Sequence, residues 1–210
     1  MAQLTSGIRS VFSWPKAYDG FQNLLGVRGF RRAYVASYLQ PFSDARILDT
    51  GCGTGEILEF LPASVTYVGF DMSPEYIRFA SKRYGSRGRW HCASVLEMDV
   101  SEVGSFDIVM ANGVFHHLDD QEALQLSAIA ASALKPSGRF CSFDGCFAPG
   151  QSKIARYLLS KDRGQNVRGP EGYLSLVEGH FSVVTLTLRH DMLSIPYTYA
   201  IIVATNPRTA

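Results

Sequence analysis

The sequence predicts an α/β fold, a doubly wound and mostly parallel sheet of seven strands with helices on both faces and an antiparallel hairpin at its end. Three observations lead to this prediction. Short β-branched or aromatic runs alternate with segments of helical spacing, as in repeated βαβ units. A glycine-rich turn follows the first run. After Asp144 the alternation stops, and two runs follow each other with no helix between them.

The first five strands are predicted from runs at residues 45–50, 65–70, 89–94, 106–111 and 138–143, which read "ARILDT", "VTYVGF", "RWHCAS", "FDIVMA" and "GRFCSF". Helical spacing separates several of them, most clearly in "SPEYIRFASKRY" (73–84) and "DQEALQLSAIAASALK" (120–135). Because each parallel connection needs a crossover, these segments are expected to cover the two faces of the sheet.

The chain after Asp144 follows a different plan. "SKIARYLLSKD" (152–162) predicts a helix, and "FSVVTLTLRHD" (181–191) and "YTYAIIVATN" (197–206) predict two strands. Only "MLSIP" separates these strands, so they are expected to form an antiparallel hairpin at the sheet edge. No repeat or long linker marks a boundary, and residues 1–210 are interpreted as a single domain in which 145–180 form an insertion after the fifth strand.

Composition excludes several classes of protein. Hydrophobic residues make up 46% and charged residues 19% of the chain, as in an ordinary globular protein. The net charge of +1 provides no field that attracts polyanions, which disfavours nucleic acid as a partner. No apolar run is long enough for a membrane span or a signal peptide, so a cytoplasmic protein without a membrane partner is expected. The four cysteines form no CxxC pair and are interpreted as reduced thiols, and no metal site is expected.

The turn after the first run has the composition of a ligand cradle. Asp49 is followed by three glycines, at 51, 53 and 55, and glycine is needed where backbone passes close to a ligand. A dinucleotide fingerprint would place its third glycine at position 56, where Glu56 stands. A carboxylate here repels a pyrophosphate but attracts the ammonium and sulfonium groups of S-adenosylmethionine. Asp71 ends the second run, where an acid can accept hydrogen bonds from ribose hydroxyls.

With these motifs the chain resembles the class I S-adenosylmethionine-dependent methyltransferases, which have a Rossmann-like fold. "ILDTGCGTGE" is similar to their first motif, "FDIVMANGVFHHL" to the motif that ends the fourth strand, and "LKPSGRF" to the turn entering the fifth. The resemblance implies that the cofactor lies against Gly51, Cys52 and Gly53 at its methionine moiety, Asp71 and Met72 at its ribose, and Asn112 and Gly113 at its ammonium group.

The resemblance also has implications for the two ends of the cofactor. After the third strand the family often has an acidic residue that bonds the adenine amine; Ser94 stands there, and it is expected to flank the adenine together with Val95. The segment before the sheet contains "YDGFQ", which is similar to lid segments in the family. Residues 1–40 are therefore expected either to pack as an extra helix or to close over the cofactor with Tyr18 and Gln22.

Candidate catalytic residues follow the fourth and fifth strands. His116 and His117 come directly after the fourth strand, where a neutral imidazole can accept a proton from a nucleophile. Adjacent histidines on a helix cannot both face one cleft, and the family often has a structural histidine here, so a structural role stays open. Asp144, at the end of the fifth strand, is the second candidate base.

The insertion offers candidate residues for the methyl acceptor. Arg163 and Arg168 flank Gly164 in a turn, where a guanidinium group can orient a carboxylate or phosphate. The alternative for both is a solvated surface charge. Tyr197, in the link between the last two strands, is expected either to reach the same pocket or to cap the hairpin.

The sequence therefore predicts methyl transfer by in-line displacement to the oxygen or nitrogen of a small molecule. Family members that act on adenine or on glutamine amides carry an Asn/Asp-Pro-Pro-aromatic run after the fourth strand, and "ANGV" lacks it. Two alternatives remain: a protein that binds S-adenosylmethionine without catalysis, and a dinucleotide-dependent oxidoreductase. The oligomeric state is not predicted.

Overall fold

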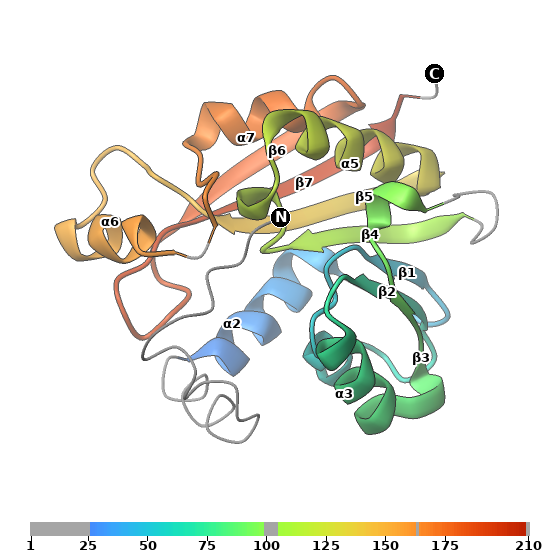
Figure 1. Cartoon of the computed structure of the whole chain (residues 1–210). Coiled ribbons are helices and arrows are strands. Elements are labelled where there is room, and N and C mark those ends of the chain that lie inside the picture. Colours follow the sequence, from blue (N-terminus) through green and yellow to red (C-terminus); the bar gives the residue numbers. More distant parts are fainter. Residues whose placement is uncertain (1–25, 99–104, 163, 209–210) are drawn as a thin grey trace.

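The computed structural model describes residues 26–98, 105–162 and 164–208, with elements labelled as in Figure 1. The strands are β1 (Arg46–Asp49), β2 (Thr66–Asp71), β3 (Gly88–Cys92), β4 (Phe106–Asn112), β5 (Leu134–Gly145), β6 (Phe181–Arg189) and β7 (Tyr199–Pro207). The α-helices are α2 (Val27–Tyr34), α3 (Pro74–Tyr84), α5 (Asp120–Ala133), α6 (Lys153–Ser160) and α7 (Pro170–Val177). Shorter turns are η2 (Val35–Leu39), η3 (Glu56–Phe60), η4 (Gly85–Arg87), η5 (Val95–Glu97) and η6 (Phe115–His117).

The strands form one seven-stranded sheet in the order β3-β2-β1-β4-β5-β7-β6. β1 to β5 are parallel, whereas β7 runs antiparallel to both β5 and β6. The predicted sheet and its C-terminal hairpin are confirmed, with β7 inserted between β5 and the edge strand β6. The strand order reverses between β1 and β4, and the carboxyl ends of parallel strands on either side of such a reversal border the usual ligand crevice.

Helices cover both faces of the sheet, as predicted. Neighbouring residues of β1 point to opposite faces: Leu48 packs in the cluster under α5 and α7, and Ile47 in the cluster under α2 and η3. Figure 1 shows α5 and α7 together on one side of the sheet, and α2 and α3 on the other. Both β1 residues are fully buried, so the sheet has the continuous apolar strands typical of a doubly wound fold.

Local sequence sets where the main helices begin. Ser73 is the N-cap of α3 and its hydroxyl accepts a hydrogen bond from the Tyr76 amide at 3.3 Å, with Pro74 in the first helical turn. α5 begins with a capping box, in which Asp119 and Glu122 each accept a hydrogen bond from the other's amide. By contrast, the connection from β1 to β2 contains only the 3-10 turn η3 of five residues.

The described part of the N-terminal segment packs against the sheet. α2 and η2 bury Phe30, Tyr34, Val35 and Leu39 in the cluster on their face. The ring of Phe30 lies 4.6 Å from that of Phe143 on β5, in a T-shaped contact. Residues 27–39 therefore pack as a helical layer, while Tyr18 and Gln22, the residues expected to cover the cofactor, lie outside the described residues.

Candidate active site

The glycine loop after β1 is packed on one side and open on the other. A Cβ atom at Gly51 would collide with Val114, on the segment after β4. Gly53 has φ +52°, and no atom of the described chain lies within 4 Å of the position of a Cβ there. Gly55 has φ +75°, and its Cβ would lie 2.6 Å from Trp90. The free space at Gly53 thus exposes bare backbone at the carboxyl end of β1, where a ligand can lie against it.

Asp71 ties this loop to the end of β2. Its Oδ2 accepts a hydrogen bond from the Gly53 amide at 2.9 Å, and its Oδ1 accepts one from the Ser73 amide at 2.8 Å. The side chain is partly exposed. Each carboxylate oxygen can accept a second hydrogen bond, so Asp71 is held in place and still has acceptor capacity next to the open face of the loop.

Asp49 lies underneath the loop rather than at its mouth, which corrects the position expected from the sequence. Its carboxyl group is buried, with 3% of the residue exposed, and accepts hydrogen bonds from the Tyr67 hydroxyl at 2.7 Å and the Gly51 amide at 3.4 Å. Burial raises the pKa of Asp49 from 3.8 to about 7, against the opposing effect of these hydrogen bonds. Asp49 therefore supports the loop from below. Cys52, also buried, packs against Gly69 of β2.

The end of β4 is fixed by α2 and β5. The Tyr34 hydroxyl donates a hydrogen bond to Asn112 Oδ1 at 2.8 Å, and the Gly113 amide donates one to the Phe143 carbonyl at 2.8 Å. Gly113 adopts φ +68°, a conformation that favours glycine. The carboxyl end of β4 is thus held next to the glycine loop, where the sequence predicts contact with the ammonium group.

The three residues predicted for the ribose and adenine end have different environments. Met72 is 53% exposed. Ser94 is the N-cap of η5, and its hydroxyl accepts a hydrogen bond from the Leu96 amide at 3.2 Å. Val95 is buried in the cluster that contains α5. Their roles in binding adenine remain predictions.

His116, Asp144, Asp162 and Tyr197 form a connected group, here called the acceptor-side cluster. The Nδ1 atom of His116 lies 2.7 Å from Asp144 Oδ1, which also accepts the His116 amide hydrogen bond at 3.1 Å. The other ring nitrogen, Nε2, lies 3.5 Å from Asp162 Oδ1. The Tyr197 hydroxyl donates a hydrogen bond to Asp162 Oδ2 at 2.7 Å. The cluster therefore joins the ends of β4 and β5 to the insertion and to the link before β7.

The carboxylates set the ionisation of this histidine. Burial disfavours the charged imidazolium, but the hydrogen bond to Asp144 and the charges of Asp144 and Asp162 outweigh it and raise the pKa of His116. Burial also raises the pKa of Asp144, although His116 opposes the shift. For Asp162, the hydrogen bond from Tyr197 and the positive histidine outweigh burial and lower its pKa. The ring of His117 lies 4.1 Å from that of His116.

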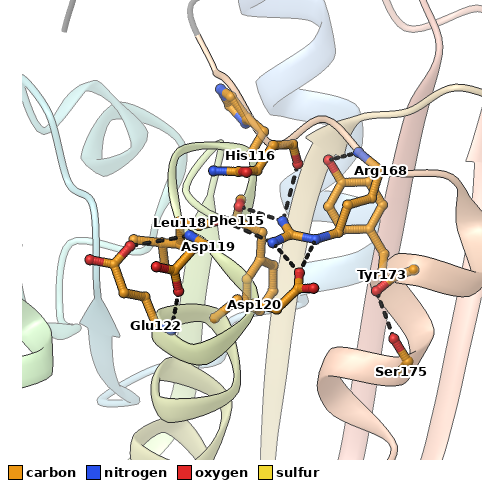
Figure 2. Close-up of polar contacts among 12 residues, drawn as sticks. Phe115, His116, Leu118, Asp119, Asp120, Glu122, Arg168, Tyr173 and Ser175 are labelled. Carbon is orange, nitrogen blue, oxygen red and sulfur yellow. Dashed lines mark hydrogen bonds and ion pairs between the residues drawn. The ribbon is translucent and has the colours of Figure 1, made fainter. Parts of the chain in front are cut away.

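Arg168 has a different role from the one the sequence suggests. Its Nη1 donates hydrogen bonds to the Phe115 and Asn166 carbonyls at 2.8 and 3.1 Å, and its Nη2 to the Leu118 carbonyl at 2.9 Å. Nη2 and Nε both donate to Asp120 Oδ1, at 2.7 and 3.0 Å (Figure 2). All five guanidinium donors thus have partners in the chain itself. Arg168 clamps the insertion to the segment after β4.

Asp162 is the functional candidate that the sequence did not reveal. It lies in the polar turn "SKDRG", which has the composition of an ordinary surface loop. Only the docking of this turn on η6 brings the carboxylate to His116; the Asn166 amide donates a hydrogen bond to the His116 carbonyl at 3.0 Å in the same contact. Arg163, the other arginine predicted for the acceptor, lies outside the described residues.

Across 26–98, 105–162 and 164–208, no helix has both the length and the apolar character for a membrane span. The same ranges contain no group of three or more His, Cys, Asp or Glu residues arranged to hold a metal ion.

Comparison with known proteins gives a family match and several relatives. Residues 47–138 match a family described as "Methyltransferase domain". A ubiquinone biosynthesis O-methyltransferase of Xanthomonas axonopodis pv. citri (strain 306) is 35% identical over 128 residues, which cover 58% of this chain and 52% of that protein. The chain thus spans about half the length of the curated relatives it matches.

Solved structures share the fold. The S-adenosylmethionine-dependent methyltransferase SibL has a TM-score of 0.70 at 18% identity, covering 96% of this chain and 60% of its own. The plantazolicin methyltransferase BpumL has a TM-score of 0.66 at 15% identity, covering 94% of this chain and 93% of its own. The family match over residues 47–138, the relatives and the sheet topology agree with the motifs in the sequence, and they support a class I S-adenosylmethionine-dependent methyltransferase domain.

Proposed function

We propose that this chain binds S-adenosylmethionine over the glycine loop and transfers its methyl group to the oxygen or nitrogen of a small molecule. The observation that carries the proposal is the hydrogen bond from Gly53 to Asp71, which joins an open backbone cradle to a carboxylate with spare acceptor capacity. Relatives named ubiquinone biosynthesis O-methyltransferase, and a structural neighbour described in complex with SAH, support the same reading.

The residues present fit this cofactor. Asp71 is placed to accept hydrogen bonds from the ribose hydroxyls, and Gly51 to Gly53 provide backbone for the methionine moiety. Glu56 stands where a dinucleotide fingerprint would have its third glycine, which disfavours a dinucleotide. When bound, the cofactor supplies a methyl group on a positively charged sulfur that is displaced in line.

We assign the proton-accepting role to His116, supported by Asp144. The Nδ1–H group donates to Asp144, which leaves the Nε2 lone pair of the neutral ring free to take a proton from the acceptor. Asp144 then holds the ring in this tautomer and stabilises the imidazolium that forms. His117 is the second candidate, because its ring stands beside that of His116.

The organisation of the chain is part of the proposal. Residues 1–210 act as one domain, and the insertion 145–180 forms the acceptor side, since Asp162 and Arg168 both contact the segment after β4. The net charge of +1 favours a small molecule over a nucleic acid as acceptor. A cytoplasmic location is supported by four cysteines that are all free thiols.

Calorimetry with S-adenosylhomocysteine tests cofactor binding. Wild type is expected to bind with micromolar-range affinity, and Asp71→Asn to weaken binding about tenfold or more, because it removes a charged acceptor. Asp44→Asn, the same change at the amino end of β1, is the control and should bind as wild type does. Absence of binding by the wild type, or equal binding by Asp71→Asn, contradicts the proposal.

Transfer of a labelled methyl group separates an enzyme from a protein that only binds the cofactor. Hydroxyl- and amine-bearing compounds are offered as acceptors, and His116→Gln is expected to lower turnover by about a hundredfold or more with cofactor affinity retained. Retained affinity without transfer to any compound favours the non-catalytic alternative.

A further inference from the structure

The acceptor-side cluster also limits what kind of molecule can be methylated, an inference that rests on the proposed function. Two carboxylates, Asp144 and Asp162, stand on either side of one imidazole, and Asp162, whose pKa is lowered, brings a negative charge to the Nε2 side of the ring. Asp144 is buried, and the side chain of Asp162 is only 22% exposed. Screening by solvent is weak at such positions, and the charges act strongly on any group placed against them.

The nearest described cation does not offset this charge for a ligand. Arg168 gives all five of its donors to Asp120 and to the carbonyls of Phe115, Leu118 and Asn166. Binding a carboxylate or phosphate would require breaking these bonds and leaving carbonyl groups unpaired. The geometry therefore removes the anion-binding role that the sequence suggests for Arg168.

The cluster instead has unused hydrogen-bond acceptors. Among the described residues Asp144 Oδ2 is buried and has no hydrogen-bond partner. The His116 Nε2 atom stands 3.5 Å from Asp162 Oδ1, too far for a strong hydrogen bond between them. Buried hydrogen-bond acceptors without donors are unfavourable. A ligand with a hydroxyl or amino hydrogen supplies a missing donor, whereas an anion adds another acceptor.

An uncharged cavity lies beside the cluster. It measures about 230 Å³ and is bordered by Gln151 and Ala155 at the start of α6 and by Pro196 and Tyr197 before β7. None of its lining residues is Lys, Arg, Asp or Glu. Tyr197 belongs to both the cavity and the cluster, because it borders the cavity and its hydroxyl donates a hydrogen bond to Asp162.

We propose that the acceptor presents a hydrogen-bond-donating hydroxyl or amino group with no anionic group beside it, and that Asp162 determines this specificity. The carboxylate of Asp162 faces the methylated group and repels an anion at the same place. A cationic or neutral acceptor is therefore selected over an otherwise identical anionic one.

Three phenols of matched size test the proposal on the full-length protein saturated with S-adenosylhomocysteine. 2-(2-Aminoethyl)phenol, 2-propylphenol and 3-(2-hydroxyphenyl)propionate share the ring and hydroxyl and differ in the charge of the tail that stands beside the hydroxyl. Their binding is followed at millimolar concentration through the NMR signals of the histidine rings, with the His116 signal assigned by His116→Gln. The propionate is expected to bind about tenfold or more weakly than the other two.

Variants test which residue causes the weaker binding of the anionic phenol. Asp162→Asn is expected to remove most of the difference in affinity between the propionate and 2-(2-aminoethyl)phenol. Asp44→Asn, which neutralises a carboxylate at the opposite end of the sheet, is expected to keep this difference. Equal or tighter binding of the propionate, or no perturbation of the His116 signal by any of the three, overturns the inference. Propionate binding that is lost in Arg163→Ala also overturns it. Failure to bind S-adenosylhomocysteine is measured first and counts against the proposed function instead.

Discussion

At the scale of single residues, Asp49 shows how burial changes the meaning of a motif. A carboxylate in front of a glycine turn attracts a cation when it faces solvent, but here it lies under the turn and accepts hydrogen bonds from Tyr67 and Gly51. Its raised pKa of about 7 means that the folded state holds the proton more tightly than the unfolded chain does. Asp49 therefore makes the folding free energy depend on pH.

The Asp49 contribution has a defined sign. The contribution of Asp49 to the unfolding free energy is fully present below the ordinary pKa of 3.8. It declines as the pH rises through the folded pKa of about 7. Asp49→Asn keeps the shape and the bond from Tyr67 but cannot ionise, so the difference in unfolding free energy between wild type and variant should change over this interval. Urea unfolding at a series of pH values measures it, and parallel curves for the two proteins would show that Asp49 titrates normally.

At the scale of elements, Arg168 is one of the residues that hold the insertion against the segment after β4. Arg168→Met keeps the aliphatic stem but leaves the Phe115, Leu118 and Asn166 carbonyls without their donor. Three such losses are expected to lower the unfolding free energy by about 3 kcal/mol, as measured from the urea midpoint. Asp120→Asn is the control: because the Asp120 side chain is 83% exposed, its loss should stay near about 0.5 kcal/mol.

A second element-scale prediction concerns the contact of the insertion with η6. A Cβ atom at Gly164 would lie 2.6 Å from the His116 carbonyl, so Gly164→Ala is expected to displace residues 162–168 from His116. Amide exchange at Asn166, which donates to that carbonyl, should become faster. Gly179→Ala, where a Cβ meets nothing within 4 Å, serves as the control and should leave exchange unchanged. Unchanged exchange in both variants would mean that the turn tolerates the side chain.

At the scale of the whole molecule, the proposed cofactor site joins strands from the middle of the seven-stranded sheet. The glycine loop belongs to β1, Asp71 to β2 and Asn112 to β4, and these strands are hydrogen-bonded neighbours. A ligand held by all three stabilises the sheet as a unit. At a concentration one hundred times its dissociation constant, S-adenosylhomocysteine should raise the unfolding free energy by about 2.7 kcal/mol.

Unfolding followed by two spectroscopic probes checks this expectation. A single shared transition that moves upward with ligand is expected for one domain, and the shift should be much smaller in Asp71→Asn at the same ligand concentration. Two separate transitions, of which only one responds to ligand, would divide the chain into independent units and contradict the single-domain proposal.

The sequence by itself determined the features that depend on near neighbours. Alternating strand and helix patterns predicted the sheet, the missing helix after β6 predicted the antiparallel hairpin, and the glycine spacing with Asp71 predicted the cofactor loop. These signals are readable because hydrophobic period, turn residues and strand ends are local properties of the chain.

Only the tertiary structure decided the roles of the charged residues. Arg168 changed from a candidate ligand for an anion to a clamp because the carbonyls it binds lie on a segment some fifty positions earlier. Asp162 lies next to His116, and Asp49 lies buried below its loop, because elements distant in sequence pack together. Charge interactions depend on distance and burial, and both are fixed only when the chain packs. No repeating pattern in the sequence indicates them.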